Sequence, residues 1–131
     1  MAISDEKIEE IAQAYTAAWN TGSPEAVASF YAEDGEIVIN RGEPWKTRSG
    51  VAEMAAGFYA DVPDLSLTCD KVRRAGDHVV YLWTFTGTHS QTGNPLKVAG
   101  WEEWDFDADL KVKSSRGWFD TEDHDRQVNG G

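Results

Sequence analysis

Glu102 is an acidic residue that the sequence pattern places among apolar side chains, and this position needs a chemical explanation. The surrounding residues alternate between apolar and polar as they do in a strand, and the alternation puts Glu102 on the apolar face, between Gly100 and Trp104. An isolated carboxylate is costly in a medium of low dielectric constant, so Glu102 must be hydrogen-bonded, paired or protonated. We predict a functional site there, and a structural ion pair with an arginine stays open as the alternative.

Three histidines and one cysteine are the other side chains suited to chemistry. We expect His78 at the surface, His124 in a solvated acidic segment, and Cys69 as a buried structural thiol. For His89 we favour the anchoring of a loop, with acid/base work at the mouth of a cavity as the alternative. The spacing of these residues and of the glycines matches no zinc site and no nucleotide-binding loop, so we expect neither a metal nor a cofactor.

The aromatic content indicates a cavity with aromatic walls. The chain has six tryptophans, four tyrosines and five phenylalanines, more than a modest core needs, although a bulky core is the simpler interpretation. In the alternating segment 78–89, Tyr81, Trp83 and Phe85 share one face, which we expect to be concave and to face the helices. The candidates for contacts with a ligand inside or at the opening of the cavity are Trp19, Asn40, Trp45, Phe58, Trp83, His89 and Trp104.

Hydrophobic spacing predicts three helices in the first half of the chain. Apolar residues recur at every third or fourth position after Ser4, and Ser23-Pro24 combines a capping hydroxyl with a proline suited to the first helical turn. The expected elements are helices over 4–19, from Pro24 through Tyr31 and from Gly50 to Pro63, with a short strand 37–39 and a loop 40–44 before the third helix.

Alternation replaces the helical period in the second half and predicts strands over 65–74, 78–89, 96–106 and 110–119. Helices followed by such strands favour an α+β fold in which a strongly curved antiparallel sheet wraps around the N-terminal helices. The outer face of segment 78–89, with Val80, Leu82 and Thr84, suits solvent or a second copy of the chain, and we expect a homodimer through it. Segment 121–131 is interpreted as a polar, partly mobile tail of a single domain that covers residues 1–131.

The amino-acid composition excludes some classes of binding partner. The 131 residues include 12 lysines and arginines against 23 aspartates and glutamates, a formal charge of −11, and fit one domain. Such an acidic surface repels phosphate backbones and anionic lipids, so we expect no nucleic-acid or membrane partner. The N-terminus has no targeting pattern and no stretch approaches the roughly 20 apolar residues of a membrane span. A cytoplasmic location is therefore expected.

A family resemblance covers nearly the whole chain. It is carried by the segments 14–22, 30–35, 48–51, 83–89 and 101–106. Together with the order of the elements, they resemble the nuclear transport factor 2-like superfamily, which includes ketosteroid isomerases, SnoaL-like polyketide cyclases, limonene epoxide hydrolases and scytalone dehydratases. The resemblance implies a cone-shaped, cystatin-like α+β fold, and it leaves the activity open because this fold supports many chemistries.

Carried over residue by residue, the ketosteroid isomerase pattern implies that Tyr15 is the oxyanion-hole tyrosine. It also implies that Glu102 is the carboxylic acid that an apolar site keeps neutral as a second hydrogen-bond donor. The isomerase's general base falls at about Ile39 or Asn40, and neither side chain takes up a proton at neutral pH, which argues against steroid isomerisation by that mechanism. The acid/base aspartate of the cyclases falls near Gly117, which has no side chain.

We therefore predict a SnoaL-like protein whose aromatic, mostly apolar pocket binds a neutral small molecule. Tyr15 and Glu102 are the predicted catalytic pair and would hydrogen-bond an oxygen of the ligand. Whether the protein is an enzyme stays open; cofactor-independent isomerisation, cyclisation, dehydration or hydrolysis would suit such a pocket. The alternative is a noncatalytic ligand-binding or dimerisation module of the same fold.

Overall fold

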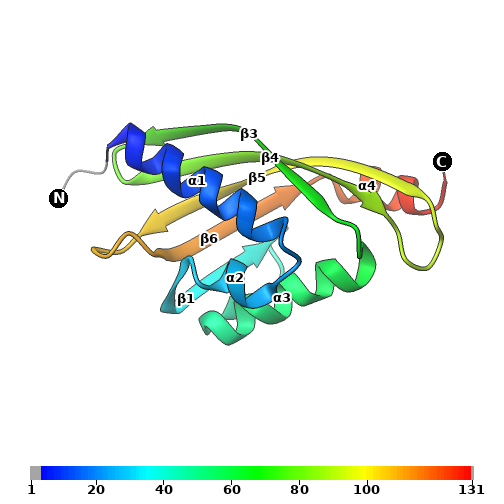
Figure 1. Cartoon of the computed structure of the whole chain (residues 1–131), viewed down its shortest axis with the longest axis horizontal. Coiled ribbons are helices and arrows are strands. Elements are labelled where there is room, and N and C mark those ends of the chain that lie inside the picture. Colours follow the sequence, from blue (N-terminus) through cyan, green and yellow to red (C-terminus); the bar gives the residue numbers. More distant parts are fainter. Residues whose placement is uncertain (1–3, 131) are drawn as a thin grey trace.

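The computed structural model of the protein describes residues 4–130. Within them, a six-stranded sheet in the order β2-β1-β6-β5-β4-β3 curves around three helices (Figure 1). The predicted α+β class with a strongly curved sheet is confirmed, and the short strand Trp45–Lys46 is an addition to the five predicted strands. The strands are β1 (Tyr31–Ile39), β2 (Trp45–Lys46), β3 (Ser66–Ala75), β4 (His78–Thr88), β5 (Pro95–Phe106) and β6 (Val112–Phe119); the helices are α1 (Asp5–Trp19), α2 (Pro24–Ala28), α3 (Thr47–Asp61) and α4 (Thr121–Val128).

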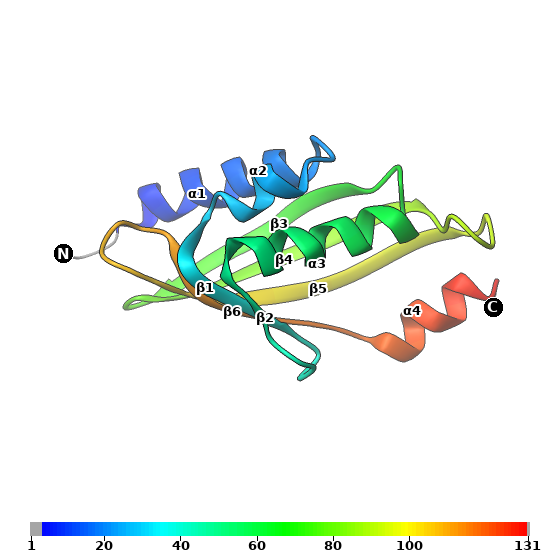
Figure 2. The same ribbon diagram turned by 90° about the horizontal axis from the view of Figure 1, so that it is seen from below.

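The N-terminal helices begin where the sequence predicts. The side chain of Ser4 accepts a hydrogen bond from the backbone N–H of Lys7 at the start of α1, and Ser23 accepts one from that of Ala26 at the start of α2. Helices α1, α2 and α3 pack on the concave face of the sheet, whereas α4 lies beyond the end of β6 and beside β5 (Figure 2). Within residues 4–130, no helix has both the length and the apolarity needed to cross a membrane.

The prediction that the second helix continues through Tyr31 is wrong. Helix α2 ends at Ala28, and Tyr31 is the first residue of β1, which is longer than the predicted strand 37–39. Strand β1 pairs in parallel with β6, and the neighbouring strand takes up the backbone hydrogen bonds that a longer helix would have made internally. The other strand pairs are antiparallel, so the sheet is mixed rather than purely antiparallel.

The segment after β6 forms a helix that the sequence pattern did not predict. Asp120 caps α4 by accepting hydrogen bonds from the backbone N–H groups of Glu122 and Asp123. The side-chain amide of Gln127 then exchanges two hydrogen bonds with the backbone of Lys97 on β5. Residues 121–128 are thus an ordered, docked helix, and Gly131 lies outside the described residues.

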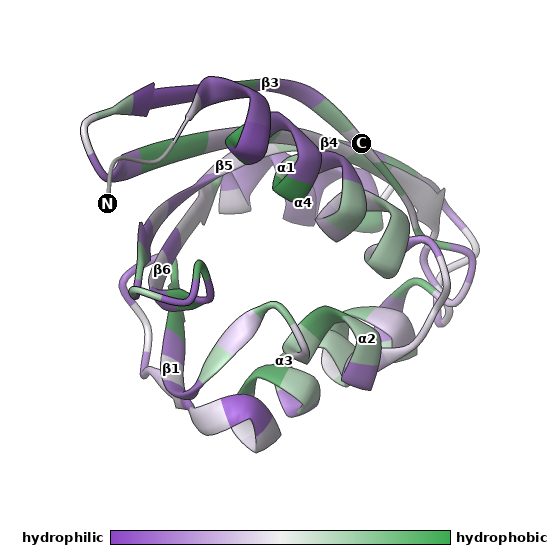
Figure 3. Cartoon of the chain, turned by 60° about the vertical axis from the view of Figure 1, so that its left-hand side comes forward, coloured by the Kyte–Doolittle hydropathy of each residue, from purple (hydrophilic) through white to green (hydrophobic). Residues whose placement is uncertain are grey.

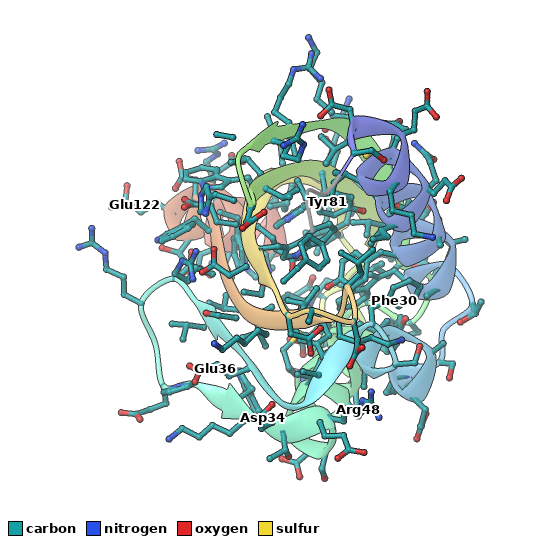
Figure 4. The ribbon with its side chains drawn as sticks, turned by 90° about the vertical axis from the view of Figure 1, so that its left-hand side faces the viewer. Phe30, Asp34, Glu36, Arg48, Tyr81 and Glu122 are labelled. Carbon is teal, nitrogen blue, oxygen red and sulfur yellow. The ribbon has the colours of Figure 1, made fainter. Side chains whose placement is uncertain are left out.

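The core lies between the helices and the concave face of the sheet. Viewed toward one end of the molecule, the sheet curves from β3 round to β1, and α2 and α3 lie opposite β3 (Figure 3). Tyr81 of β4 is completely buried and lies inside this curve, whereas Glu122 of α4 lies on the outside (Figure 4). The predicted assignment of the aromatic face of β4 to the interior is confirmed, since Tyr81, Trp83 and Phe85 are all buried.

Candidate functional site

The carboxyl group of Glu102 lies at the centre of a buried hydrogen-bond network. Its Oε1 accepts hydrogen bonds from Ser115 Oγ at 2.8 Å, Trp104 Nε1 at 3.0 Å and the Tyr31 hydroxyl at 3.2 Å. The Tyr15 hydroxyl donates to the same carboxyl and lies 3.2 Å from both oxygens. Oε1 therefore has three further donors, while Oε2 is contacted by Tyr15 alone among the described residues. Oε2 retains the unused hydrogen-bonding capacity.

Four different elements bring these donors together. Tyr15 comes from the buried stripe of α1 and Tyr31 from the first position of β1. Trp104 and Ser115 stand opposite each other in the antiparallel pairing of β5 and β6. Tyr81 stacks on the Trp104 indole with ring centroids 4.8 Å apart, and this fixes the orientation of the indole N–H.

The donors around Glu102 are all uncharged. The ion pairs among the described residues do not include Glu102, so the alternative of a structural pair with an arginine is not realised there. Burial raises the pKa of Glu102, and the hydrogen bonds from its four neighbours only partly offset this. Burial, followed by the charge of Glu102, raises the pKa of Tyr15 and Tyr31 well above 10, so both phenols stay protonated donors. Glu102 is therefore the member of this network that can exchange a proton.

A cavity of about 50 Å³ adjoins the carboxyl group. The cavity is larger than the space that a single buried water needs, so it has room for a small ligand. Glu102 is the titratable residue of the lining, and Gly117 of β6 lies beside it. The remaining lining residues are apolar and include five aromatic rings, those of Trp19, Phe58, Trp83, Phe85 and Phe119.

Three of the predicted ligand-binding residues lie in the cavity wall. Trp19 ends α1, Phe58 lies in the last turn of α3, and Trp83 projects from β4. The indole N–H of Trp19 is buried and has no hydrogen-bond partner among the described residues. A buried donor without a partner is uncommon in folded proteins, and here it belongs to a residue of the wall.

The other predicted ligand-binding residues do not line the cavity, and the structure shows a different role or position for each of them. Trp104 is fully buried behind Glu102 and donates to it. Asn40 accepts from the backbone N–H of Phe119 and so holds the end of β6, and Trp45 is 39% exposed on β2. The His89 ring is hydrogen-bonded to Thr92 in the β4–β5 loop, the favoured loop-anchoring role.

Tyr31, Ser115 and Phe119 are parts of the site that the sequence did not single out. Tyr31 was assigned to a helix, and the face of the last strand could not be decided from its pattern. The signal available for Tyr31 was its place in the segment 30–35 that carries the family resemblance. For residues 4–130, no three His, Cys, Asp or Glu side chains are arranged as metal ligands would be.

The comparisons with known proteins agree with this fold. The family model of the SnoaL-like domain matches residues 12–114. The chain therefore belongs to the SnoaL-like family, within the nuclear transport factor 2-like superfamily. None of the curated proteins is significantly similar to it.

Several solved structures share the fold over most of the chain. A hypothetical protein with a ketosteroid isomerase-like fold from Catenulispora acidiphila, in complex with trimethylamine, is 24% identical with a TM-score of 0.84, covering 92% of each chain. TsrD from Streptomyces laurentii is 19% identical over 98% of this chain and 99% of its own, with a TM-score of 0.84. The epoxide hydrolase/cyclase-like enzyme SalBIII is 15% identical over 92% of this chain and 95% of its own, with a TM-score of 0.80. At these identities the likeness shows the fold.

Proposed function

We propose that this SnoaL-like protein binds a small, neutral, mostly apolar molecule in the cavity and anchors one oxygen atom of it through Glu102. The observation that carries the proposal is a buried carboxyl group with only uncharged donors around it, in the wall of an otherwise apolar cavity. A carboxyl in such surroundings favours its neutral form and then donates a hydrogen bond to a carbonyl or hydroxyl oxygen.

Catalysis in this pocket would depend on Glu102 acting with Tyr15. Glu102 would polarise a ligand carbonyl as a neutral acid, and the Tyr15 hydroxyl would support the developing negative charge. Because Glu102 is the titratable group of the lining, it would have to donate its proton to a ligand oxygen and then take one back, from the ligand in an isomerisation, cyclisation or dehydration or from the attacking water in a hydrolysis. The epoxide hydrolase/cyclase-like description of SalBIII supports chemistry of this kind.

Binding of cyclopentanone at several pH values tests the anchor. The indole N–H resonance of Trp104 reports on Glu102, because the indole donates to its carboxyl group. We expect cyclopentanone to shift this resonance at low pH and to bind more weakly as the pH rises through the raised pKa of Glu102. Trimethylamine is the control, since a complex with it exists for the Catenulispora acidiphila protein. Binding of its cation that strengthens with rising pH would contradict a neutral ligand.

A noncatalytic dimerisation module is the second candidate, and the outer face of the sheet supports it. Leu82 and Trp101 are 37% and 41% exposed, and Trp101 stacks on Trp118 with ring centroids 5.5 Å apart. Leu82 and Trp101 are paired across β4 and β5, so they form one apolar patch suited to a second copy of the chain. Sedimentation of the wild type and of Trp101→Glu tests this homodimer; equal masses at monomer size for both would rule it out. We also propose a cytoplasmic location, which the single cysteine supports, because one cysteine cannot form a disulfide within the chain.

A further inference from the structure

Four glycines lie within strands, and one of them differs from the rest. A Cβ atom added at Gly35, Gly87 or Gly100 would come within 2.7, 2.2 or 2.3 Å of a neighbouring heavy atom, respectively, so these positions have no room for a side chain. At Gly117 the nearest atom would be Cγ of Glu102 at 3.5 Å, which is an ordinary van der Waals contact. Close packing therefore accounts for three of the strand glycines but not for Gly117.

The backbone does not require a glycine at this position either. Gly117 is not among the glycines with positive φ. It lies in the middle of the sheet, where it pairs with Ile39 of β1 and with Glu102 of β5. Glycine weakens a strand interior because it loses more conformational freedom than other residues and packs nothing against its neighbours. Its remaining effect is to leave space open inside the cavity, whose wall it forms.

We propose that Gly117 is the specificity-determining residue of the pocket, because its missing side chain leaves the space beside Glu102 that receives the oxygen-bearing end of the ligand. The proposal rests on the function proposed above. A Cβ at this position would lie 3.5 Å from Glu102 and 3.9 Å from Cγ1 of Ile39, so a larger side chain would extend over the carboxyl group. The ligand class that fits is a small ketone or alcohol whose carbon atoms next to the oxygen occupy this space.

Gly117→Ala and Gly117→Val test the proposal, with Gly57→Ala as the matched control. Gly57 lies on the exposed side of α3, where an added Cβ would meet nothing within 4 Å. Gly100→Ala provides the contrasting case of a glycine that packing requires. The measurements are the melting temperature, the uptake of xenon as a probe of the cavity, and the binding of acetone, cyclopentanone and acetophenone followed through the Trp104 indole resonance.

We expect Gly117→Ala to melt at or above the wild-type temperature, whereas Gly100→Ala melts well below it. Gly117→Ala should retain acetone and bind acetophenone about tenfold more weakly or worse, since one methyl group in a closed pocket has an effect of this size. Gly117→Val should lose xenon and all three ketones. Gly57→Ala should leave xenon uptake and ketone binding unchanged and should melt slightly above the wild type, because alanine favours a helix interior more than glycine does.

Three results would overturn the role of Gly117. They are a large loss of stability in Gly117→Ala, wild-type binding of every probe by both Gly117 variants, and no entry of xenon into the wild type. If xenon enters and Gly117→Val excludes it while no ketone binds, Gly117 still shapes the cavity and the proposed anchoring by Glu102 fails. The two proposals can therefore fail separately.

Discussion

Glu102 and Glu103 are neighbours on β5, yet their surroundings are opposite. Glu102 points into the core, where tyrosine, serine and tryptophan side chains donate to it. On the outer face, Glu103 lies 3.1 Å from His78 Nε2, and Asp105 lies 3.1 Å from Nη1 of Arg116. Partial burial by itself would raise the pKa of Asp105, but His78 and Arg116 outweigh it and lower the pKa. Asp105 is thus held as an anion by basic side chains.

The difference shows how one strand serves two purposes. Partners that carry charge keep a carboxylate ionised, whereas uncharged donors in a dry site allow it to take up a proton. The outer pairs are partly exposed to solvent and contribute little to stability. The inner network is buried, so each of its members has a larger energetic effect. Substitutions at matched positions on the two faces test this contrast.

Trp104→Ala should have the largest effect on the free energy of unfolding. Trp104 is fully buried, and its loss leaves a large cavity and removes a donor to Glu102. We expect a loss of about 3–5 kcal/mol in urea denaturation. Glu103→Ala on the outer face of the same strand, whose ion pair with His78 is partly exposed, is the control, with an expected loss below about 1 kcal/mol. Similar losses in the free energy of unfolding for the two variants would show that the inner and outer faces of β5 do not differ in their contribution to stability.

Ser115→Ala should have the next largest effect. The hydroxyl of Ser115 makes the shortest hydrogen bond to Glu102, and its removal should cost about 1–3 kcal/mol of stability. Because this hydrogen bond lowers the pKa of Glu102, the pKa should rise in the variant. Carboxyl ¹³C NMR gives the pKa, and Ser114→Ala on the outer face is the control. An unchanged or lower pKa in Ser115→Ala would contradict this account of the network.

Glu102→Gln should change how stability depends on pH. Since the pKa of Glu102 is raised by folding, its neutral form favours the native state below the unfolded pKa of about 4.3. That contribution is lost as the pH rises toward the folded pKa, at about 1.4 kcal/mol per pH unit. We expect urea denaturation to show this decline in the wild type and not in Glu102→Gln. Parallel pH profiles for the two proteins would show that the carboxyl is not perturbed.

Asp105→Asn should have the smallest effect, and its pH dependence should have the opposite sign. The lowered pKa of Asp105 stabilises the native state above the unfolded pKa of about 3.9 and loses this effect as the pH falls through the folded value. We expect a difference of less than about 1 kcal/mol between wild type and variant, because the pair is half exposed. Urea denaturation between pH 2 and pH 7 measures it. The advantage of wild type over the variant should grow as the pH rises from 2, and an advantage that shrinks with rising pH would contradict the assignment.

Local alternation was sufficient to predict the position of Glu102, because β5 keeps a period of two over the residues around it. The last strand could not be read in the same way. Phe106 pairs with Val112 while Asp105 pairs with Ser114, so β6 has one extra residue at this point. Val112 and Ser115 consequently face the same side although their spacing is odd. A bulge depends on the partner strand, and sequence alternation alone does not reveal it.

Tyr31 was missed for a related reason. Its apolar neighbours continue the spacing of α2, and the competing interaction is a parallel pairing with a strand at the other end of the chain. Local propensity carries no information about such a distant partner. The family resemblance did include the segment 30–35, but it assigned no role to Tyr31. The site residues that depend on pairing between distant strands could therefore not be predicted from the local sequence pattern.

The parallel pairing of β1 with β6 also affects how the protein is made. Tyr31 is synthesised long before its strand partner Val112 and its neighbour Ser115. The wall of the cavity and the donors to Glu102 can therefore assemble only after the residues of β6 have left the ribosome. Contacts between such distant residues form slowly. A ligand of the finished pocket would bind the completed fold and not the growing chain, and would stabilise the protein in proportion to the logarithm of its concentration.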